Sequence, residues 1–127
     1  MKLGKKLSIK ALPYDLSVCK VESFDATLLR DELCFVGKTD EELSLVCQSE
    51  HTPENCLARE DGWKAFRVQG VLDFSLTGIL AGIAKLLSEN GVPIFAVSTY
   101  NTDYILIKTE KYQKALDLLV ANGYSME

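Results

Sequence analysis

Long apolar runs, prolines and histidines are all scarce in this sequence of 127 residues, which has three prolines and one histidine. No segment reaches the roughly 20 consecutive apolar residues that cross a bilayer, so we expect no membrane association. The lysines at the N-terminus are not followed by the roughly 7–15 apolar residues of a signal peptide. We therefore expect a cytoplasmic protein.

A basic excess is also absent. Lysine and arginine together number 14 against 18 acidic residues, which gives a net charge of −4. The only local basic cluster lies near the N-terminus and lacks interleaved aromatic residues, which is typical of a solvated chain end: Lys2, Lys5, Lys6 and Lys10. Because the nucleic-acid backbone demands clustered basic side chains, we do not expect this chain to bind DNA or RNA.

The cysteines form no C-x-x-C pair; they stand at positions 19, 34, 47 and 56. Without a secretory signal, such scattered cysteines indicate reduced core or strand residues. Cys47, His51 and Cys56 are zinc-ligand types close together in the sequence. Their spacing matches no common zinc pattern and a fourth ligand is missing, so we predict neither a metal site nor a cofactor.

Catalytic signatures are missing as well. Any Ser-His-Asp or Cys-His arrangement would have to use His51, which lies in a polar loop and is interpreted as a surface histidine. There is no phosphate-binding glycine loop, no H-E-x-x-H motif and no nucleophile elbow. The acidic runs Asp31-Glu32 and Asp40–Glu42 are interpreted as solvated turns. We therefore predict that the protein is not an enzyme.

The second half shows clear periodicity. Alternating and helical apolar spacings predict the order β-α-β-β-α, with Ser75 and Thr109 as helix caps and glycines at the helix ends. The elements expected are a strand at 63–71, a helix from 75 to 91, strands at 94–98 and 104–107, and a helix from 109 to 123.

The first half is richer in strands. Residues 7–21 predict a hairpin or a bent pair of strands, and residues 33–47 a strand, a polar turn and a second strand. Ser23 is expected to cap one short helix, and Thr52 with Pro53 to start another that Gly62 ends. The segments 33–50 and 94–110 share a strand–turn–strand plan, which we interpret as a weak internal repeat.

Two loops of the second half suggest a binding site. In Asp73–Gly78 a strand leads into a helix, whose free N–H groups suit a carboxylate; alternatively, Gly78 and Gly82 only let the helix pack closely on the sheet. Ser98–Asp103 is more polar than a turn requires, although a plain hairpin turn is the alternative. An aspartate there could hold an α-amino group, so the two loops together would bind both ends of an amino acid.

These residues resemble the ACT domain, specifically the ACT-like group shared with the CASTOR arginine sensors. The resemblance is carried by Ser75–Leu80 and by Ile94–Ile107, while Asp40–Val46 is similar to the acidic turn and strand of small bacterial members. It implies an α+β fold with antiparallel sheets, in which a ferredoxin-like β-α-β-β-α unit (62–127) is fused to a truncated, helix-poor ACT-like unit (1–61).

The resemblance also implies a regulatory protein that binds a small molecule, an amino acid, at an inter-unit or dimer interface. CASTOR chains hold two such tandems and this chain holds one, so we predict a homodimer. The expected ligand-binding residues combine those implied by the resemblance with the polar turn: Ser75, Thr77, Gly78, Ile94, Thr99, Asn101, Thr102 and Asp103. The alternative is a ligand-free structural scaffold of the same fold that serves an unidentified protein partner.

Overall fold

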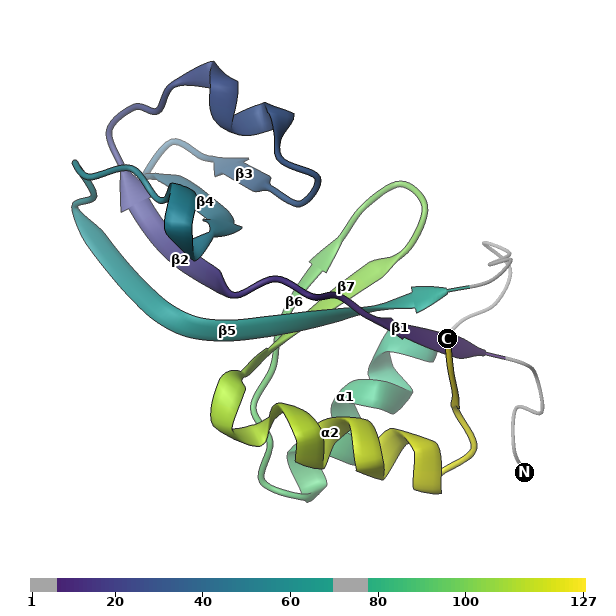
Figure 1. Cartoon of the computed structure of the whole chain (residues 1–127). Helices are drawn as coiled ribbons and strands as arrows, with labels where there is room; N and C mark the ends of the chain where they lie inside the picture. The colour runs from purple at the N-terminus through teal and green to yellow at the C-terminus, as the bar shows by residue number, and fades with distance from the viewer. Residues whose placement is uncertain (1–6, 70–77) are drawn as a thin grey trace. The chain divides into compact units, whose positions relative to one another are not determined.

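The computed structural model describes residues 7–69 and 78–127 (Figure 1). The chain forms two compact units. The C-terminal unit combines the start of the chain through Pro13 with Lys64–Glu127, and the N-terminal unit is Tyr14–Trp63. The first strand of the chain therefore belongs to the C-terminal unit. The predicted division between residues 61 and 62 assigns this strand to the other unit. That both halves are ACT-like units stays a prediction.

The C-terminal unit contains a sheet with antiparallel pairings and a parallel pairing at its last strand. In order, its strands are β6 (Phe95–Ser98), β7 (Asp103–Lys108), the second part of β5 (Ala58–Gln69), β1 (Ser8–Ala11) and β8 (Ser125–Met126). The two-residue strand β8 was not predicted, because so short a segment is held by its pairing with β1 and not by its own sequence pattern.

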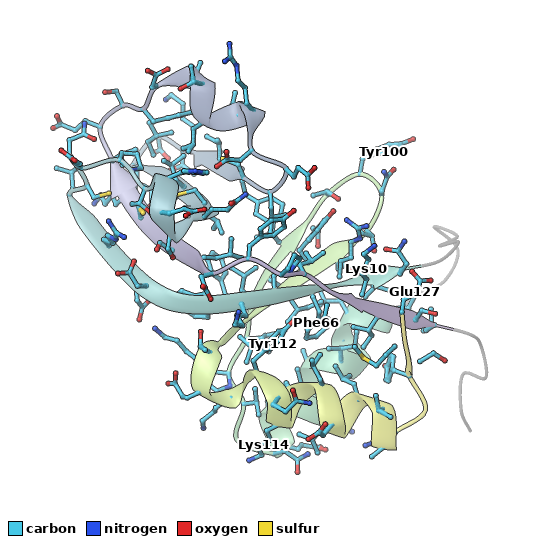
Figure 2. The ribbon with its side chains drawn as sticks, in the orientation of Figure 1. Lys10, Phe66, Tyr100, Tyr112, Lys114 and Glu127 are labelled. Carbon is cyan, nitrogen blue, oxygen red and sulfur yellow. The ribbon has the colours of Figure 1, made fainter. Side chains whose placement is uncertain are left out.

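Two helices cover one face of this sheet, α1 (Ile79–Glu89) and α2 (Thr109–Ala121) (Figure 1). The apolar core between them and the strands includes alternate residues of β5 and β7, as the period of two in a strand requires: Phe66, Val68, Ile105, Ile107, Ile83, Leu87 and Leu119. Figure 2 shows Phe66 between β5 and the helices. The predicted order β-α-β-β-α and the α+β class are confirmed.

The glycines predicted the C-terminal ends of the two helices correctly, whereas the caps predicted for the N-terminal ends did not find the same support. Gly91 and Gly123 have φ values of 76° and 99° just after α1 and α2, as predicted for left-handed C-terminal glycines. Thr109 is wrong as a cap, since it is the first residue of α2 and Lys108 takes the cap position. The predicted cap Ser75 lies outside the described residues.

The N-terminal unit is built from strands. Its sheet order is β3 (Phe35–Lys38), β4 (Leu43–Gln48), β2 (Leu16–Val21) and the first part of β5. The strand–turn–strand prediction for 33–47 is confirmed by the antiparallel pairing of β3 with β4. For residues 7–21 the bent-pair alternative is correct and the hairpin is wrong, because β1 and β2 each pair with β5 and not with each other.

Helical structure in the N-terminal unit is limited to two short 3-10 turns, η1 (Ala26–Arg30) and η2 (Ser49–His51). Asp25 caps η1 by accepting from the Thr27 N–H at 2.9 Å, so Ser23 was the wrong cap. This unit is helix-poor, as predicted. Among the helices of the described residues, none has the length and apolarity that a membrane crossing requires.

The short helix predicted to start at Thr52 is absent, and the chain enters β5 at Ala58. Gly62 does not end a helix but lies inside β5 with a φ of 86°. The register of β5 against β2 shifts there by one residue, from Leu16↔Trp63 to Val18↔Glu60. A left-handed glycine is a signal for a β-bulge as well as for a helix end, and the strand pairing decided in favour of the bulge.

Candidate functional site

The polar turn between β6 and β7 closes tightly. The strands pair up to Ser98↔Asp103. Beyond that pair the Thr99 N–H donates to the Thr102 carbonyl at 2.8 Å, and the Thr99 hydroxyl contacts the same carbonyl at 3.1 Å. Tyr100 stands at the tip with 83% of its surface exposed (Figure 2). Four of the predicted ligand-binding residues, at positions 99 and 101–103, are thus brought together in one ordered turn.

The carboxylate of Asp103 is oriented by its cross-strand partner. The Ser98 hydroxyl donates to Asp103 Oδ1 at 2.6 Å, a short hydrogen bond to a charged acceptor. Asp103 is half-buried at the first position of β7, where a rigid strand holds its backbone. The hydrogen bond and the strand together fix the direction of the carboxylate. Its second oxygen is therefore held ready to bind a cation.

Thr102 connects the turn to β5. Its hydroxyl donates to the Val68 carbonyl at 2.7 Å, one residue before β5 ends at Gln69. Because this hydroxyl hydrogen is used within the protein, Thr102 is a positioning residue that keeps the turn beside the end of β5. The described chain leaves β5 at Gln69 and resumes at Gly78, just before α1.

The start of α1 lacks a capping side chain at its cap position. Gly78 occupies that position with a φ of 81°, and the first helical bond runs from the Gly82 N–H to the Gly78 carbonyl at 2.8 Å. A glycine offers no side-chain acceptor to the N–H groups of the first turn. These N–H groups can therefore donate hydrogen bonds to an anion. A Cβ at Gly78 would meet nothing within 4 Å, so its backbone angle and not space favours glycine there. Ser75 and Thr77 lie outside the described residues.

Ile94 lies apart from the turn. Its side chain packs against the core of the C-terminal unit. Its neighbour Phe95 pairs with Leu106, at the opposite end of β6 from the Ser98↔Asp103 pair. The three residue steps from Phe95 to Ser98 span roughly 10 Å, at about 3.3 Å per residue along a strand. Within one chain, the structure therefore does not bring Ile94 to the turn.

Arg67 was not singled out in the sequence but belongs to the surroundings of the turn. It lies on β5 next to Val68, with Nε donating to Gln69 Oε1 at 2.7 Å and Nη1 3.4 Å from the Tyr104 hydroxyl. Its guanidinium is 6.0 Å from the centre of the Tyr104 ring. In the sequence Arg67 is one of several charged residues on an alternating strand, and no spacing signal distinguishes it.

A cavity of about 500 Å³ opens in the N-terminal unit and was not predicted. Its lining mixes carboxylates, hydroxyls and apolar groups: Ser23, Phe24, Asp25, Thr27, Leu28, Asp31, His51, Pro53 and Asn55. His51 Nδ1 lies 2.8 Å from Asp31 Oδ2, and the Asp31 side chain is only 16% exposed. The interpretation of Asp31 as part of a solvated turn was therefore wrong.

The cysteines also gather in the N-terminal unit. Cys19 and Cys47 are buried in its core, with Cys34 and Cys56 packed against them. Burial raises the pKa of Cys19 to about 12 and raises the pKa values of Cys34 and Cys47 as well. These thiols are protonated at neutral pH and are poor nucleophiles. Within residues 7–69 and 78–127, no group of three or more His, Cys, Asp or Glu side chains could hold a metal ion.

Comparison with known proteins gives a sequence match to the ACT domain family over residues 58–121. No curated protein matches the chain. Among solved structures, the protein Atu0741 from Agrobacterium tumefaciens is 30% identical with a TM-score of 0.87, covering 98% of this chain and 94% of that one.

Two structures of aspartate kinases share the fold at lower identity. The aspartate kinase from Synechocystis is 15% identical with a TM-score of 0.69, covering 94% of this chain but 27% of its own. The ligand-free regulatory subunit of aspartate kinase from Thermus thermophilus is 10% identical with a TM-score of 0.66, covering 91% of this chain and 96% of its own.

Proposed function

This chain belongs to the ACT domain family, whose sequence model matches half of it, and from that premise we propose that it is a non-catalytic regulatory protein that binds an amino acid. The ligand lies at the Ser98–Asp103 turn and the start of α1, at an interface between two copies. The fold shared with a regulatory subunit of aspartate kinase supports a regulatory role. The closer link to the CASTOR sensors stays a prediction.

The observation that carries the proposal is the fixed carboxylate of Asp103. Ser98 orients one oxygen at 2.6 Å, and the bond from Thr102 to Val68 keeps the turn against β5. A binding site whose groups are held before the ligand arrives loses less conformational entropy on binding. An α-amino group would bind the second oxygen of Asp103.

The start of α1 supplies the complementary charge. An α-carboxylate accepts well from the free N–H groups of a helix N-terminus, where the helix dipole also favours negative charge. The helix is 11 residues long and begins after the cap position of Gly78. An amino acid carries both groups, so the two elements select a zwitterion over a simple anion or cation.

The turn is poorly equipped for catalysis. The Ser98 hydroxyl gives its hydrogen to a carboxylate, and a serine nucleophile needs an imidazole or amine base in that position. The single histidine, His51, is paired with Asp31 in the N-terminal unit. Binding that shifts an equilibrium between two states requires only differential affinity and no chemical step.

A second copy would join along β6. Within the described residues β6 pairs with β7 alone, so its other edge is open to strand addition. Thr99 donates to Thr102 across the ladder, and the alternation of an antiparallel ladder then directs the N–H groups of Ala96 and Ser98 outward. Pairing there would place the Ser98–Asp103 turns of both copies at or next to the interface.

Proline substitutions at two sheet edges test this interface. Ala96→Pro removes an outward N–H of β6 without removing a bond to β7, and we expect it to convert dimers to monomers. Val36→Pro makes the equivalent change on β3, the edge strand of the N-terminal unit, and should leave the dimer intact. Sedimentation equilibrium measures both; a native chain that is monomeric at all concentrations would refute the dimer.

Thermal unfolding in the presence of each amino acid tests ligand binding. A ligand at about 100 times its Kd adds roughly 2.7 kcal/mol, which raises the Tm by several degrees. Asp103→Asn keeps an acceptor for Ser98 but removes the charge, and it should abolish the shift. Asp117→Asn is the matched control on α2, where Asp117 accepts from Gln113 of the same helix at 2.9 Å. If no amino acid shifts the Tm, the ligand-free scaffold replaces the sensor.

A further inference from the structure

The cavity of the N-terminal unit is a second candidate binding site, made entirely of residues 23–55. We propose that it binds a small organic cation with an apolar stem, an alkyl amine or guanidine, between the carboxylates of Asp25 and Asp31. This proposal is separate from the amino-acid site of the C-terminal unit, and either one can fail alone.

The size of the cavity fits a small molecule. Its volume is about 500 Å³, within the range of roughly 300–1,000 Å³ typical of ligand sites. It lies between the two 3-10 turns, with η1 contributing Thr27 and Leu28 and η2 contributing His51. Two such short turns cover less of a sheet than full helices would, and the space between them forms the cavity.

The charge of the lining favours a cation. The lining contains two carboxylates, those of Asp25 and Asp31, and one imidazole, that of His51, but neither lysine nor arginine. Asp25 uses Oδ1 to cap η1, and Asp31 uses Oδ2 for His51. In the hydrogen bonds described, each carboxylate thus keeps one oxygen that can accept from a ligand. Hydrogen bonds to charged groups contribute about 1.5–3 kcal/mol each.

The apolar part of the lining is well supported by the core. Phe24 and Leu28 belong to this part and at the same time pack against the buried core around Cys19, Leu45 and Cys47. Leu28 is 8% exposed, so its position is fixed by the core and not by a ligand. An aromatic face such as that of Phe24 also attracts a cation. This part of the lining suits the alkyl stem of an amine or guanidine.

His51 is the positioning residue of this site. Its bond to Asp31 joins the end of η2 to the residue that follows η1, two segments 20 positions apart in the sequence. Holding the two turns together fixes the width of the cavity and leaves the Asp31 carboxylate only 16% exposed. A partly buried carboxylate is screened less by salt than a surface one, which strengthens its attraction for a cation.

Agmatine is the probe that we would use, because it carries an amine and a guanidinium on a butyl stem and has no carboxylate. We expect it to shift the amide resonances of Phe24, Leu28 and His51 saturably in the ¹⁵N-labelled chain. The matched compound 4-guanidinobutanoate replaces the amine by a carboxylate and should bind at least about tenfold more weakly. Amide shifts of Ser98–Asp103 should not accompany binding of agmatine.

Charge-neutral variants locate the site. Asp25→Asn and Asp31→Asn should each weaken agmatine binding about tenfold, the loss of one charged hydrogen bond. Asp40→Asn removes a charge from the β3–β4 turn of the same unit and should change affinity less than about twofold. If Asp31→Asn unfolds the unit, Asn55→Lys brings an ammonium group to the lining from an exposed position and should abolish binding.

The proposal is overturned if the native chain shows no saturable shifts at residues 23–55 with about 10 mM agmatine, or if Asp40→Asn weakens binding as much as Asp31→Asn.

Discussion

The β3–β4 hairpin of the N-terminal unit and the β6–β7 hairpin of the C-terminal unit have the same plan. Each joins a four-residue strand to a six-residue strand, and β4 and β7 bury their residues in the same order. Both turns close through a threonine, with the Thr39 N–H 2.9 Å from the Glu42 carbonyl and the Thr99 N–H 2.8 Å from the Thr102 carbonyl. The strand–turn–strand plan predicted for both segments is confirmed, and the internal repeat that we inferred from it stays a prediction.

The two hairpins differ in the pair of residues that ends each ladder. In the C-terminal unit this pair is Ser98 with Asp103, joined by a hydrogen bond; in the N-terminal unit it is Lys38 with Leu43. The backbone plan is thus shared, whereas only the C-terminal hairpin ends its ladder with an aspartate that is hydrogen-bonded to a cross-strand serine. Under the proposed function, the turn supplies the geometry, and these two side chains decide whether it binds an amino acid.

The helical layers differ as well. After its hairpin the C-terminal unit continues into α2, which has 13 residues, whereas the N-terminal unit has only the three residues of η2. The C-terminal unit consequently buries a larger apolar cluster, and the N-terminal unit holds the cavity instead. The comparison predicts that the two units respond differently to the same kind of change.

The largest effect is expected for Phe66→Ala in the core of the C-terminal unit. Phe66 is fully buried, and its truncation should cost about 3–5 kcal/mol of unfolding free energy. The matched change Leu45→Ala in the N-terminal core should cost about 2–5 kcal/mol, toward the lower end because the cavity nearby lets the unit relax. Urea unfolding measures both, and a larger loss for Leu45→Ala would reverse the assignment of the stronger core.

A smaller effect is expected for Gly62→Ala at the bulge in β5. The φ of 86° forces an alanine into the left-handed region, at a cost of roughly 1–2 kcal/mol. The control is Gly37→Ala in β3, where φ is not positive and an added Cβ would meet nothing within 4 Å. Equal or greater stability of the Gly62→Ala chain in urea would show that the bulge does not need this angle.

Thr102→Val should cost about 1 kcal/mol, because it leaves the Val68 carbonyl without a hydrogen bond that is 2.7 Å long. Thr39→Val removes exposed contacts to the Glu41 and Glu42 N–H groups, where water replaces the hydroxyl, and should cost less than about 0.5 kcal/mol. Thermal unfolding distinguishes these values. Similar losses would mean that the connection from the turn to β5 adds nothing to stability.

The smallest effect at neutral pH concerns the thiols. Burial raises the pKa of Cys19 from 9.0 to about 12. The folded chain therefore keeps a proton that the unfolded chain loses, so this stability is complete below about pH 9 and is lost as the pH rises toward 12. Cys19→Ala should flatten the decline in urea stability between pH 8 and about pH 10.5. An unchanged slope would contradict a buried, protonated thiol.

The C-terminal unit was largely predictable because its signals are local. The helical spacing from Ile79 to Leu87 and the left-handed glycines Gly91 and Gly123 are properties of short segments, and the structure follows them. The helix expected at Thr52 failed because the same residues serve the approach to β5, which pairs with distant strands. Strand pairing overrode local propensity there.

The candidate sites were predictable to different degrees. The turn at Ser98–Asp103 is contiguous, so its polar composition was visible in the sequence, but the bonds from Ser98 to Asp103 and from Thr102 to Val68 required the fold. The cavity depends on Asp31 meeting His51 across 20 positions, and no pattern links them. Whether Ser75, Thr77 and Ile94 also bind ligand stays a prediction.

The most direct test of the difference between the two hairpins is amide chemical-shift mapping with each of the amino acids. The chain is labelled with ¹⁵N and titrated, and the resonances of Ser98–Asp103 are followed beside those of Lys38–Leu43. We predict that one amino acid, or a few related ones, shifts the first set saturably and leaves the second unchanged. Shifts confined to Lys38–Leu43, or no saturable shift at Ser98–Asp103 with any amino acid, would contradict the proposal that the turn of the C-terminal unit is the regulatory site.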